Sequence, residues 1–277
     1  MAIRSEWHIH THCSCDGACM EFETLINDAK KYGVSDFGVT DHYHTRLQEA
    51  DIAASRAEYD RAIERHPELK GHFHFGIEAT LMSQWEIDKI ARGEYTTPPI
   101  WGIRHGGPAN APVAFDFDEE FLEKYKIDYV VTGMHWPMYC ETDEQSLLKE
   151  YHRQYMIAAA HPFTDILAHY TWYDKNIYPG VENPFLDFTK VSETMRSELK
   201  HCLIENKVAF ELNAFLFFLP QTFIDEYLGF AAELQRSGVI LSQGCDSHER
   251  DLSSVHYDEI AKTYEHYGIK TEEFFCL

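Results

Sequence analysis

Histidines and carboxylates recur along this sequence at positions suited to binding metal ions. The run His8-Ile9-His10-Thr11-His12 places three imidazoles two residues apart. Side chains two apart on an extended strand point to the same side, so these rings can line one surface. An isolated His-x-His is otherwise an ordinary polar strand edge. The prediction of a metal site therefore depends on the rest of the chain.

Six further strand-like segments also end in residues of metal-ligand type. They end in Thr40-Asp41-His42, Gly76-Ile77-Glu78, Gly133-Met134-His135, Leu167-Ala168-His169, Glu211-Leu212-Asn213 and Gly244-Cys245-Asp246-Ser247-His248. Singly, each has an ordinary alternative: a histidine can cap a helix, and Glu78 can pair with an arginine. Burying so many acids and imidazoles together without cations would cost several kcal/mol per charge. The set as a whole predicts a polynuclear site for divalent ions.

Short β-rich runs alternate with longer amphipathic runs, which is typical of repeated β/α units around a parallel sheet. Strands are predicted at residues 6–12, 36–40, 72–77, 129–133, 165–169, 208–213 and 239–243. Helices are predicted at residues 22–32, 50–66, 118–126, 143–160, 188–206 and 220–237. In a β/α barrel the carboxyl ends of the strands meet at one mouth, where the chemistry of this architecture takes place. Such a barrel would gather the ligands.

One segment does not fit this alternation. Residues 81–115 are rich in proline, glycine and aromatic side chains, and they are too long for an ordinary β/α connection. We interpret them as an inserted excursion or lid. The segment carries Arg104 and His105, and Arg104 is a candidate substrate-binding residue together with Arg250, which follows the last strand.

The composition restricts the classes of function. The 46 acidic residues against 24 basic ones give a formal charge of -22, which repels polyanions and disfavours long nucleic acid as a partner. No apolar run reaches the roughly 18 residues of a membrane span, and the N-terminus lacks the features of a signal or transit peptide. The seven scattered cysteines are typical of reduced thiols. We expect a cytoplasmic protein without membrane association.

In chain order, these motifs resemble the polymerase and histidinol phosphatase (PHP) superfamily. The matching elements extend from His10-Thr11-His12, through Asp165-Ile166-Leu167-Ala168-His169, to Cys245-Asp246-Ser247-His248. Each element is weak singly, whereas the ordered set is specific. The resemblance implies an α/β fold, a distorted seven-stranded (β/α)7 barrel forming a single PHP-type domain over residues 1–277. It also implies two or three divalent metal ions, commonly zinc, manganese or iron.

The resemblance further implies how the ligands are shared among the ions. His10, His12, Glu78 and Asp246 would hold one ion, and Glu78 would bridge to a second ion held by His135 and His169. A third ion would use His42, His248 and an early-loop residue, for which Asp16 is our candidate. Asp16 also has an alternative role as a simple turn residue within Cys15-Asp16-Gly17.

Three other histidines need interpretation. His8 stands where the family usually has Asp, and we expect it to support the ligands or to be an extra one. His161 is an alternative to His169, but it precedes the strand and would lie at its amino end, away from the mouth. His44 is a loop residue that is positioned to touch the substrate.

The predicted activity is that of a metal-dependent hydrolase, a phosphoesterase that cleaves a small phosphomonoester by metal-bound hydroxide. Histidinol phosphate is one candidate substrate that the family suggests. Asp246 or His248 would supply the leaving-group proton, and Arg104 or Arg250 would assist charge stabilisation. The alternatives are a phosphodiesterase or nuclease, a hydrolase of a carbon centre such as an amide, and a non-catalytic metal-binding remnant.

Overall fold

The computed structural model describes residues 2–95, 107–135, 139–173 and 182–277. Its main sheet has seven parallel strands, in the spatial order β1 (Ser5–Glu6), β2 (Asp36–Tyr43), β3 (Phe73–Thr80), β6 (Tyr129–Gly133), β7 (Ile166–Leu167), β8 (Ala209–Asn213) and β9 (Leu241–Gly244). The first and last strands meet, because Trp7 N donates to Gln243 O over 3.1 Å and Asp246 N donates to His8 O over 2.8 Å. The predicted distorted seven-stranded barrel is confirmed.

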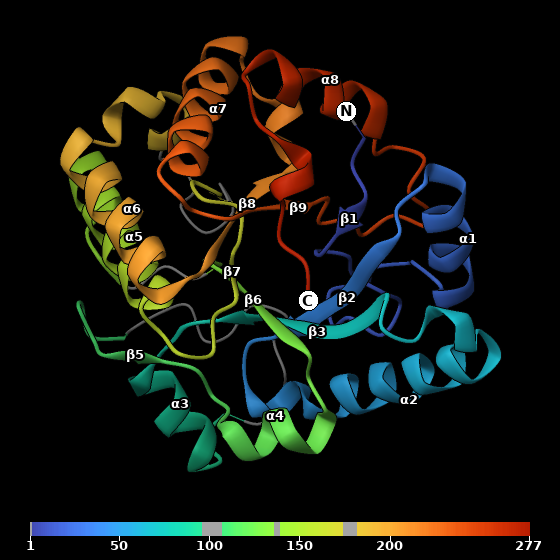
Figure 1. Cartoon of the computed structure of the whole chain (residues 1–277). Coiled ribbons are helices and arrows are strands. Elements are labelled where there is room, and N and C mark those ends of the chain that lie inside the picture. Colours follow the sequence, from blue (N-terminus) through green and yellow to red (C-terminus); the bar gives the residue numbers. More distant parts are fainter. Residues whose placement is uncertain (1, 96–106, 136–138, 174–181) are drawn as a thin grey trace.

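Helices surround this barrel as an outer ring (Figure 1). They are α1 (Phe22–Tyr32), α2 (Glu49–Arg65), α3 (Gln84–Ala91), α4 (Glu119–Tyr125), α5 (Glu144–Ala159), α6 (Glu193–Asn206), α7 (Gln221–Arg236) and α8 (Tyr257–His266). Short 3-10 helices lie at Arg46–Gln48, Pro67–Leu69, Pro184–Leu186, Phe188–Lys190, Ala214–Phe218 and Thr271–Glu273. Among the described residues, no helix combines the length and hydropathy of a membrane span.

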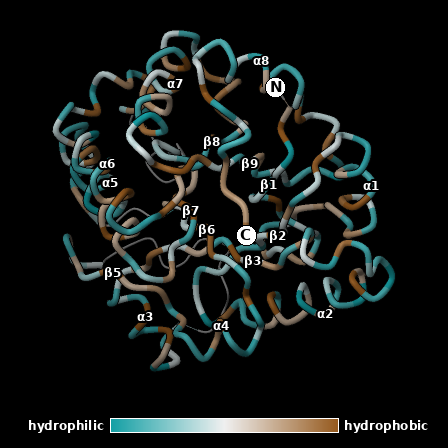
Figure 2. The backbone as a smooth tube through the Cα atoms, in the orientation of Figure 1, coloured by the Kyte–Doolittle hydropathy of each residue, from teal (hydrophilic) through white to brown (hydrophobic). Residues whose placement is uncertain are grey.

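The helix faces follow the sequence pattern. In α1, the apolar residues Phe22, Leu25, Ile26 and Ala29 recur every three to four positions and are all buried. The helix ends at Gly33, which has a φ of 74° and donates its N–H to Ala29 O. Figure 2 shows hydrophilic and hydrophobic residues alternating along the helices of the ring, as expected for elements that pack one face on a barrel.

Several predicted boundaries are wrong. In place of the strand expected at residues 6–12, the chain forms the two-residue strand Ser5–Glu6. Beyond it, single β-bridges form at Ile9 and Thr11. The helix expected from residue 188 begins at Glu193, because the Ser192 side chain caps it by accepting from Met195 N. Helices α3 and α8 were not predicted.

The two ends of the segment predicted as an excursion, residues 81–115, are held together by a short β-ladder. The two-residue strand β4 (Met82–Ser83) pairs antiparallel with β5 (Val113–Ala114), and α3 follows β4 directly. Leu81, Met82 and Phe115 are buried, so both ends of the segment pack against the body of the protein. Residues 96–106, with Arg104 and His105, lie outside the described residues.

An apolar plug fills the floor of the barrel. It consists of Trp7, Tyr129, Val131, Ile166, Ala168 and Ala209, with Phe275 packed against it. The carboxyl-terminal segment crosses the floor, where Phe275 O accepts from Trp7 Nε1 over 2.9 Å. Gly38 and Gly76 make room for the Tyr129 ring, since a Cβ at either position would lie within 2.7 Å of it. The floor therefore supports the strands from below.

Candidate metal centre

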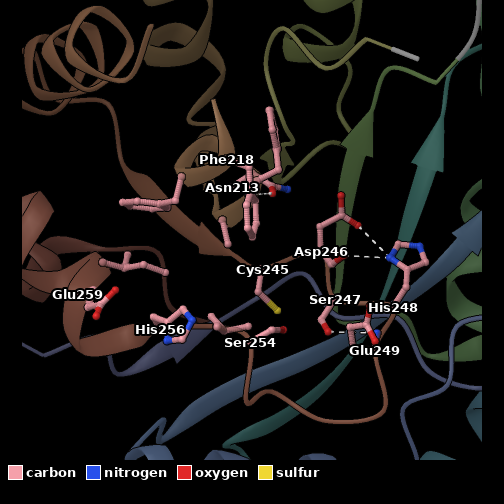
Figure 3. Close-up of a pocket in the computed structure, with 15 residues that line it drawn as sticks. Asn213, Phe218, Cys245, Asp246, Ser247, His248, Glu249, Ser254, His256 and Glu259 are labelled. Carbon is pink, nitrogen blue, oxygen red and sulfur yellow. Dashed lines mark hydrogen bonds and ion pairs between the residues drawn. The ribbon is translucent and has the colours of Figure 1, made fainter. Parts of the chain in front are cut away.

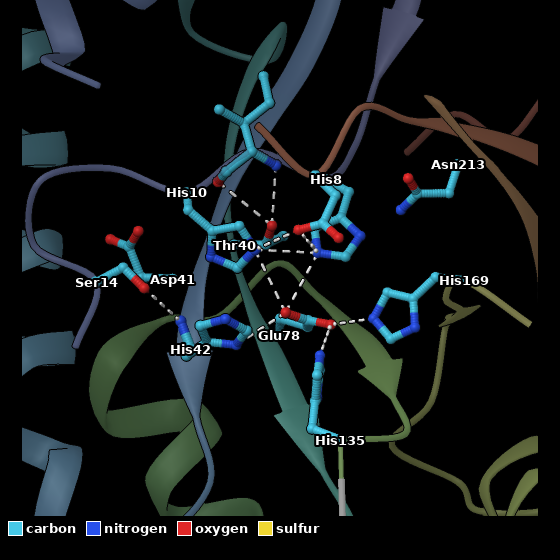
Figure 4. Close-up of polar contacts among 12 residues, drawn as sticks. His8, His10, Ser14, Thr40, Asp41, His42, Glu78, His135, His169 and Asn213 are labelled. Atoms are coloured by element: carbon cyan, nitrogen blue, oxygen red, sulfur yellow. Dashed lines mark hydrogen bonds and ion pairs between the residues drawn. The ribbon is translucent and has the colours of Figure 1, made fainter. Parts of the chain in front are cut away.

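Imidazoles and carboxylates converge above this floor, at the carboxyl ends of the strands. Figure 4 shows His8, His10, His42, His135 and His169 around Glu78. Parallel pairing of β2 and β3 sets His42 opposite Glu78, and β3 pairs in turn with β6. The potential ligand atoms form overlapping groups whose members lie within 4.8 Å of one another. The converging residues are His8, His10, Asp16, His42, His44, Glu78, His135, His169, Asp246 and His248.

The first group contains His8, His10, Glu78 and Asp246. The Nε2 atoms of the two histidines lie 3.2 Å apart, and each lies 3.3 Å from Glu78 Oε2. Asp246 Oδ1 lies 3.5 Å from His8 Nε2 and 3.1 Å from His10 Nε2. A tetrahedron of ligands at zinc bond lengths has edges of about 3.3–3.4 Å. The spacing and the N and O donors of this group therefore fit a zinc-like ion.

The second group uses the other oxygen of Glu78. Glu78 Oε1 lies 3.3 Å from His135 Nε2 and 2.9 Å from His169 Nε2. Glu78 is completely buried at the centre of the cluster. A single carboxylate thus faces two ligand groups, one with each oxygen. This is the arrangement needed for a carboxylate that bridges two cations.

A third group lies beside the first. Asp16 Oδ2 is 3.2 Å from His42 Nε2 and also contacts His248 Nε2. The His248 ring stacks on the His10 ring with centroids 4.2 Å apart. The structure therefore brings the early loop, strand β2 and the segment after β9 together. Asp16 is a member of this group, not only a turn residue.

The backbone is strained where two of these residues lie. Asp246 has a φ of 52° and His169 has a φ of 28°, a region that residues other than glycine seldom occupy. Two glycines leave room for buried carboxylates: Gly133 for Glu78, and Gly244 for Glu211. A Cβ at Gly133 would lie 2.3 Å from Glu78 Oε1, and one at Gly244 would lie 1.9 Å from Glu211 Oε1.

Neighbouring polar groups hold the ligands in place. Asp41, on the opposite face of β2 from His42, accepts from Thr11 N over 2.6 Å and from Ser55 Oγ over 2.5 Å. It therefore anchors the early loop. Thr80 Oγ1 lies 2.8 Å from His135 Nδ1, so that ring can direct its Nε2 at Glu78.

The buried carboxylates of the cluster need positive charge beside them. Among the described residues, Glu78, Asp246 and Asp16 form ion pairs only with histidines. Burial acts to raise the pKa of Glu78, but the imidazoles around it hold this pKa well below its usual value. Burial acts to lower the pKa of His42, but Glu78 and Asp16 raise it to about 10. Bound divalent ions would supply the same positive charge.

The structure brings together eight of the nine predicted ligands and places His12 elsewhere. The chain turns after Thr11, where Ser14 N donates to Thr11 O over 2.9 Å. His12 is about one-third exposed, and its Nδ1 lies 3.4 Å from Met20 O and 3.4 Å from Glu21 Oε2. His8 occupies the position expected for His12. Three histidines with the same spacing gave no signal in the sequence to choose between them.

The remaining predicted residues lie in different settings. His44 is buried at the edge of the cluster, where it forms a further group with His42 and His135. Its Nδ1 lies 3.0 Å from Thr80 Oγ1, and burial lowers its pKa to about 3. His161 precedes β7, and its ring packs against Phe115, away from the mouth. Arg250 is exposed and does not line the cavity beside the cluster. Arg104 lies outside the described residues.

A cavity of about 610 Å³ adjoins the cluster (Figure 3). Its lining includes Asp246 and His248 of the cluster, together with Phe215, Phe217 and Phe218 from the 3-10 helix after β8. Sequence reasoning missed these aromatics. The signal was available, since the apolar run 214–218 directly follows the ligand-type strand end Glu211-Leu212-Asn213.

The chain belongs to the PHP domain family, whose profile matches residues 6–215. It is similar in structure to a histidinol phosphate phosphatase from Lactococcus lactis subsp. lactis Il1403 in complex with zinc, L-histidinol and phosphate. The TM-score is 0.62 at 13% identity, covering 97% of this chain and 95% of that one. The putative histidinol phosphatase from Listeria monocytogenes gives a TM-score of 0.60 at 12% identity, covering 92% and 99%. A comparison with curated proteins finds no match.

Proposed function

We propose that this protein is a metal-dependent phosphoesterase that hydrolyses a phosphomonoester of a small molecule. The observation that carries the proposal is the buried Glu78, whose two oxygens face two separate sets of imidazoles. Membership of the PHP domain family supports it. The structural neighbour from Lactococcus lactis also supports it, because that protein was solved with zinc, L-histidinol and phosphate bound.

The ligand assignment follows the geometry. His8, His10, Glu78 and Asp246 would hold one divalent ion, with His8 in the role first expected of His12. Glu78, His135 and His169 would hold a second ion. Asp16, His42 and His248 are the candidates for a third. Imidazole and carboxylate donors suit zinc, manganese or iron.

Bound ions of this kind lower the pKa of coordinated water toward about 7 and neutralise charge on phosphoryl oxygens. The chain itself must protonate the leaving alcohol. Asp246 is a poor donor, because His8 and His10 hold its pKa well below the usual value although burial opposes them. Burial also opposes protonation of His248, but Asp16 and Asp246 raise the pKa of its ring. With the first two ions bound and no ion in the third group, we assign proton donation to His248, which lines both the cluster and the cavity.

The alcohol part of the substrate would occupy the cavity beside His248. Its walls combine the apolar surfaces of Phe215, Phe217 and Ile260 with the polar groups of Asn213 and His256. A small organic leaving group fits a cavity of about 610 Å³. Histidinol phosphate is the first substrate to test, because the Lactococcus lactis neighbour was solved with L-histidinol and phosphate.

The proposal is tested with protein reconstituted with zinc or manganese and a panel of substrates. The panel contains histidinol phosphate, p-nitrophenyl phosphate, bis-p-nitrophenyl phosphate and an amide. We expect phosphate release from the monoesters, loss of that activity in Asp246→Ala, and its retention in His12→Ala. Faster cleavage of the diester would instead assign a phosphodiesterase. Bound metal without turnover of any substrate would overturn the proposal and identify a metal-binding remnant.

A further inference from the structure

We propose that Glu211 is a positioning residue that couples the first two metal groups, because its carboxylate holds a ligand of each from below. It holds the His8 ring of the first group and the His169 backbone of the second. The inference rests on the metal binding in the proposed function and is independent of the substrate.

The geometry places Glu211 beneath the cluster. It lies two residues after Ala209 on β8, so both side chains face the barrel interior. Ala209 belongs to the apolar floor, whereas the Glu211 side chain, 1% exposed, reaches the cluster above. The cavity-facing Asn213 also contacts it, donating from Nδ2 to Glu211 Oε2 over 3.0 Å.

The contact with His8 determines how that ring faces the cluster. Glu211 Oε1 lies 2.6 Å from His8 Nδ1. With Glu211 as the acceptor of this hydrogen bond, Nδ1 is the donor and carries the proton. The lone pair on Nε2 is then left for the group formed with His10, Glu78 and Asp246. A carboxylate behind a metal-binding histidine fixes its orientation and raises its basicity.

The contact with His169 acts through the backbone. Glu211 Oε2 accepts from His169 N over 2.6 Å. His169 has a φ of 28°, and this hydrogen bond helps to hold the strained conformation in which Nε2 lies 2.9 Å from Glu78 Oε1. Glu78 therefore links the two groups from within the cluster, while Glu211 links them from below.

Two further observations support this role. A Cβ on Gly244 of the neighbouring strand would lie 1.9 Å from Glu211 Oε1, so the Glu211 carboxylate fits only because residue 244 has no side chain. Within the described ranges, the only ion pair of Glu211 is with His8. Glu211 is therefore not part of a structural pair with lysine or arginine, and its charge serves the cluster.

The test measures zinc affinity without substrate, by competition between metal-free protein and a chromogenic chelator. Glu211→Gln keeps the shape of the side chain, but its amide group cannot accept at both His8 and His169. We expect zinc affinity to fall by about 10–100-fold at both of the two tightest sites, as is typical when a support of metal ligands is lost. The proton NMR signal of the His8 Nδ1–H should also lose its strongly downfield position.

The matched control is Glu150→Gln. Glu150 is also buried, and its Oε1 accepts from Arg153 Nη2 over 2.7 Å and from Gln154 Nε2 over 3.3 Å. It lies on helix α5 and not beside the cluster, so its variant should bind zinc as the parent does. Glu211→Asp keeps the charge on a shorter side chain that cannot reach both partners. Glu211→Asp should bind zinc with an affinity between those of the parent and Glu211→Gln. It replaces Glu211→Gln as the test variant if that variant fails to fold.

The outcomes separate this inference from the proposed function. If the parent binds zinc and Glu211→Gln binds it equally tightly at both sites, the coupling role is wrong while the metal-dependent activity stands. If only one site weakens, Glu211 supports a single ligand and the coupling is also wrong. If the parent binds no zinc, manganese or iron, both proposals fall together.

Discussion

The two halves of the barrel interior differ sharply although the same strands build them. On β8, Ala209 lies in the apolar floor and Glu211 lies beneath the metal-ligand cluster. On β3, Gly76 makes room for the Tyr129 ring and Glu78 lies at the centre of the cluster. Side chains two apart on a strand lie about 6.6–6.8 Å from one another on the same face. Over this distance, the side chains of the barrel interior change from apolar packing residues to the carboxylates of the metal-ligand cluster.

The comparison shows where stability and function reside. The floor buries large side chains, such as Trp7 and Tyr129, against one another. The mouth buries carboxylates and imidazoles and contains strained residues at positions 169 and 246, which is costly unless cations bind. We therefore expect changes at the mouth to act on metal binding and activity, and changes at the floor to act on unfolding.

The largest expected effect is at the mouth. Glu78→Gln removes the charge that both groups share and should remove both ions. Loss of about 4 kcal/mol of charge stabilisation corresponds to a decrease on the order of a thousandfold in hydrolysis rate. Metal content by mass spectrometry and initial rates would check this. A variant that kept two ions would show that Glu78 is not the bridge.

At the floor, Trp7→Ala should lower the free energy of unfolding by about 3–5 kcal/mol, because a fully buried ring leaves a cavity. The folded variant should bind zinc with the parent's affinity. Phe218→Ala is the matched control, since Phe218 is 85% exposed and its loss should change stability by less than about 0.5 kcal/mol. Urea unfolding measures both. A large drop in the zinc affinity of Trp7→Ala would break the separation of the two halves.

The pH dependence of zinc binding should sharpen the comparison. The pKa of His42 is raised to about 10, so its protonation stabilises the metal-free fold fully below about pH 6.5 and this contribution is lost as the pH rises through 10. Zinc must displace that proton to bind the His42 ring. The free energy of zinc binding therefore becomes more favourable by about 1.4 kcal/mol per pH unit for one proton released. At equal free zinc, the zinc-induced rise in Tm should be about 5 °C larger at pH 8.5 than at pH 6.5. An equal rise at both pH values would contradict displacement of protons.

The smallest expected effect comes from a single methyl group. Gly133→Ala places a Cβ 2.3 Å from Glu78 Oε1, which displaces the carboxylate and should lower zinc affinity by about tenfold. Gly229→Ala, on helix α7, is the control, because a Cβ there has nothing within 4 Å and should stabilise the helix by about 0.5–1 kcal/mol. Chelator competition and thermal melts distinguish the two. Unchanged zinc affinity in Gly133→Ala would show that the mouth tolerates movement of Glu78.

The sequence by itself determined the repeated β/α pattern and the strand ends that carry the ligands. Strand β6 and helix α1 have the predicted bounds, because their periodicities are strong and Gly33 ends the helix. Helix α3 lies inside a segment whose composition favours loops, so local patterns concealed it.

Only the tertiary structure decided which histidines of the first strand converge with Glu78. His8, His10 and His12 share one face in any extended strand, so alternation treats them alike. Long-range contacts choose between them: Ile9 bridges to Ser247, and Thr11 is tied to Asp41. These contacts turn the chain after Thr11 and direct His12 away from the mouth. Pairing between residues more than two hundred positions apart is not encoded in any local pattern, and it determines the centre of this protein.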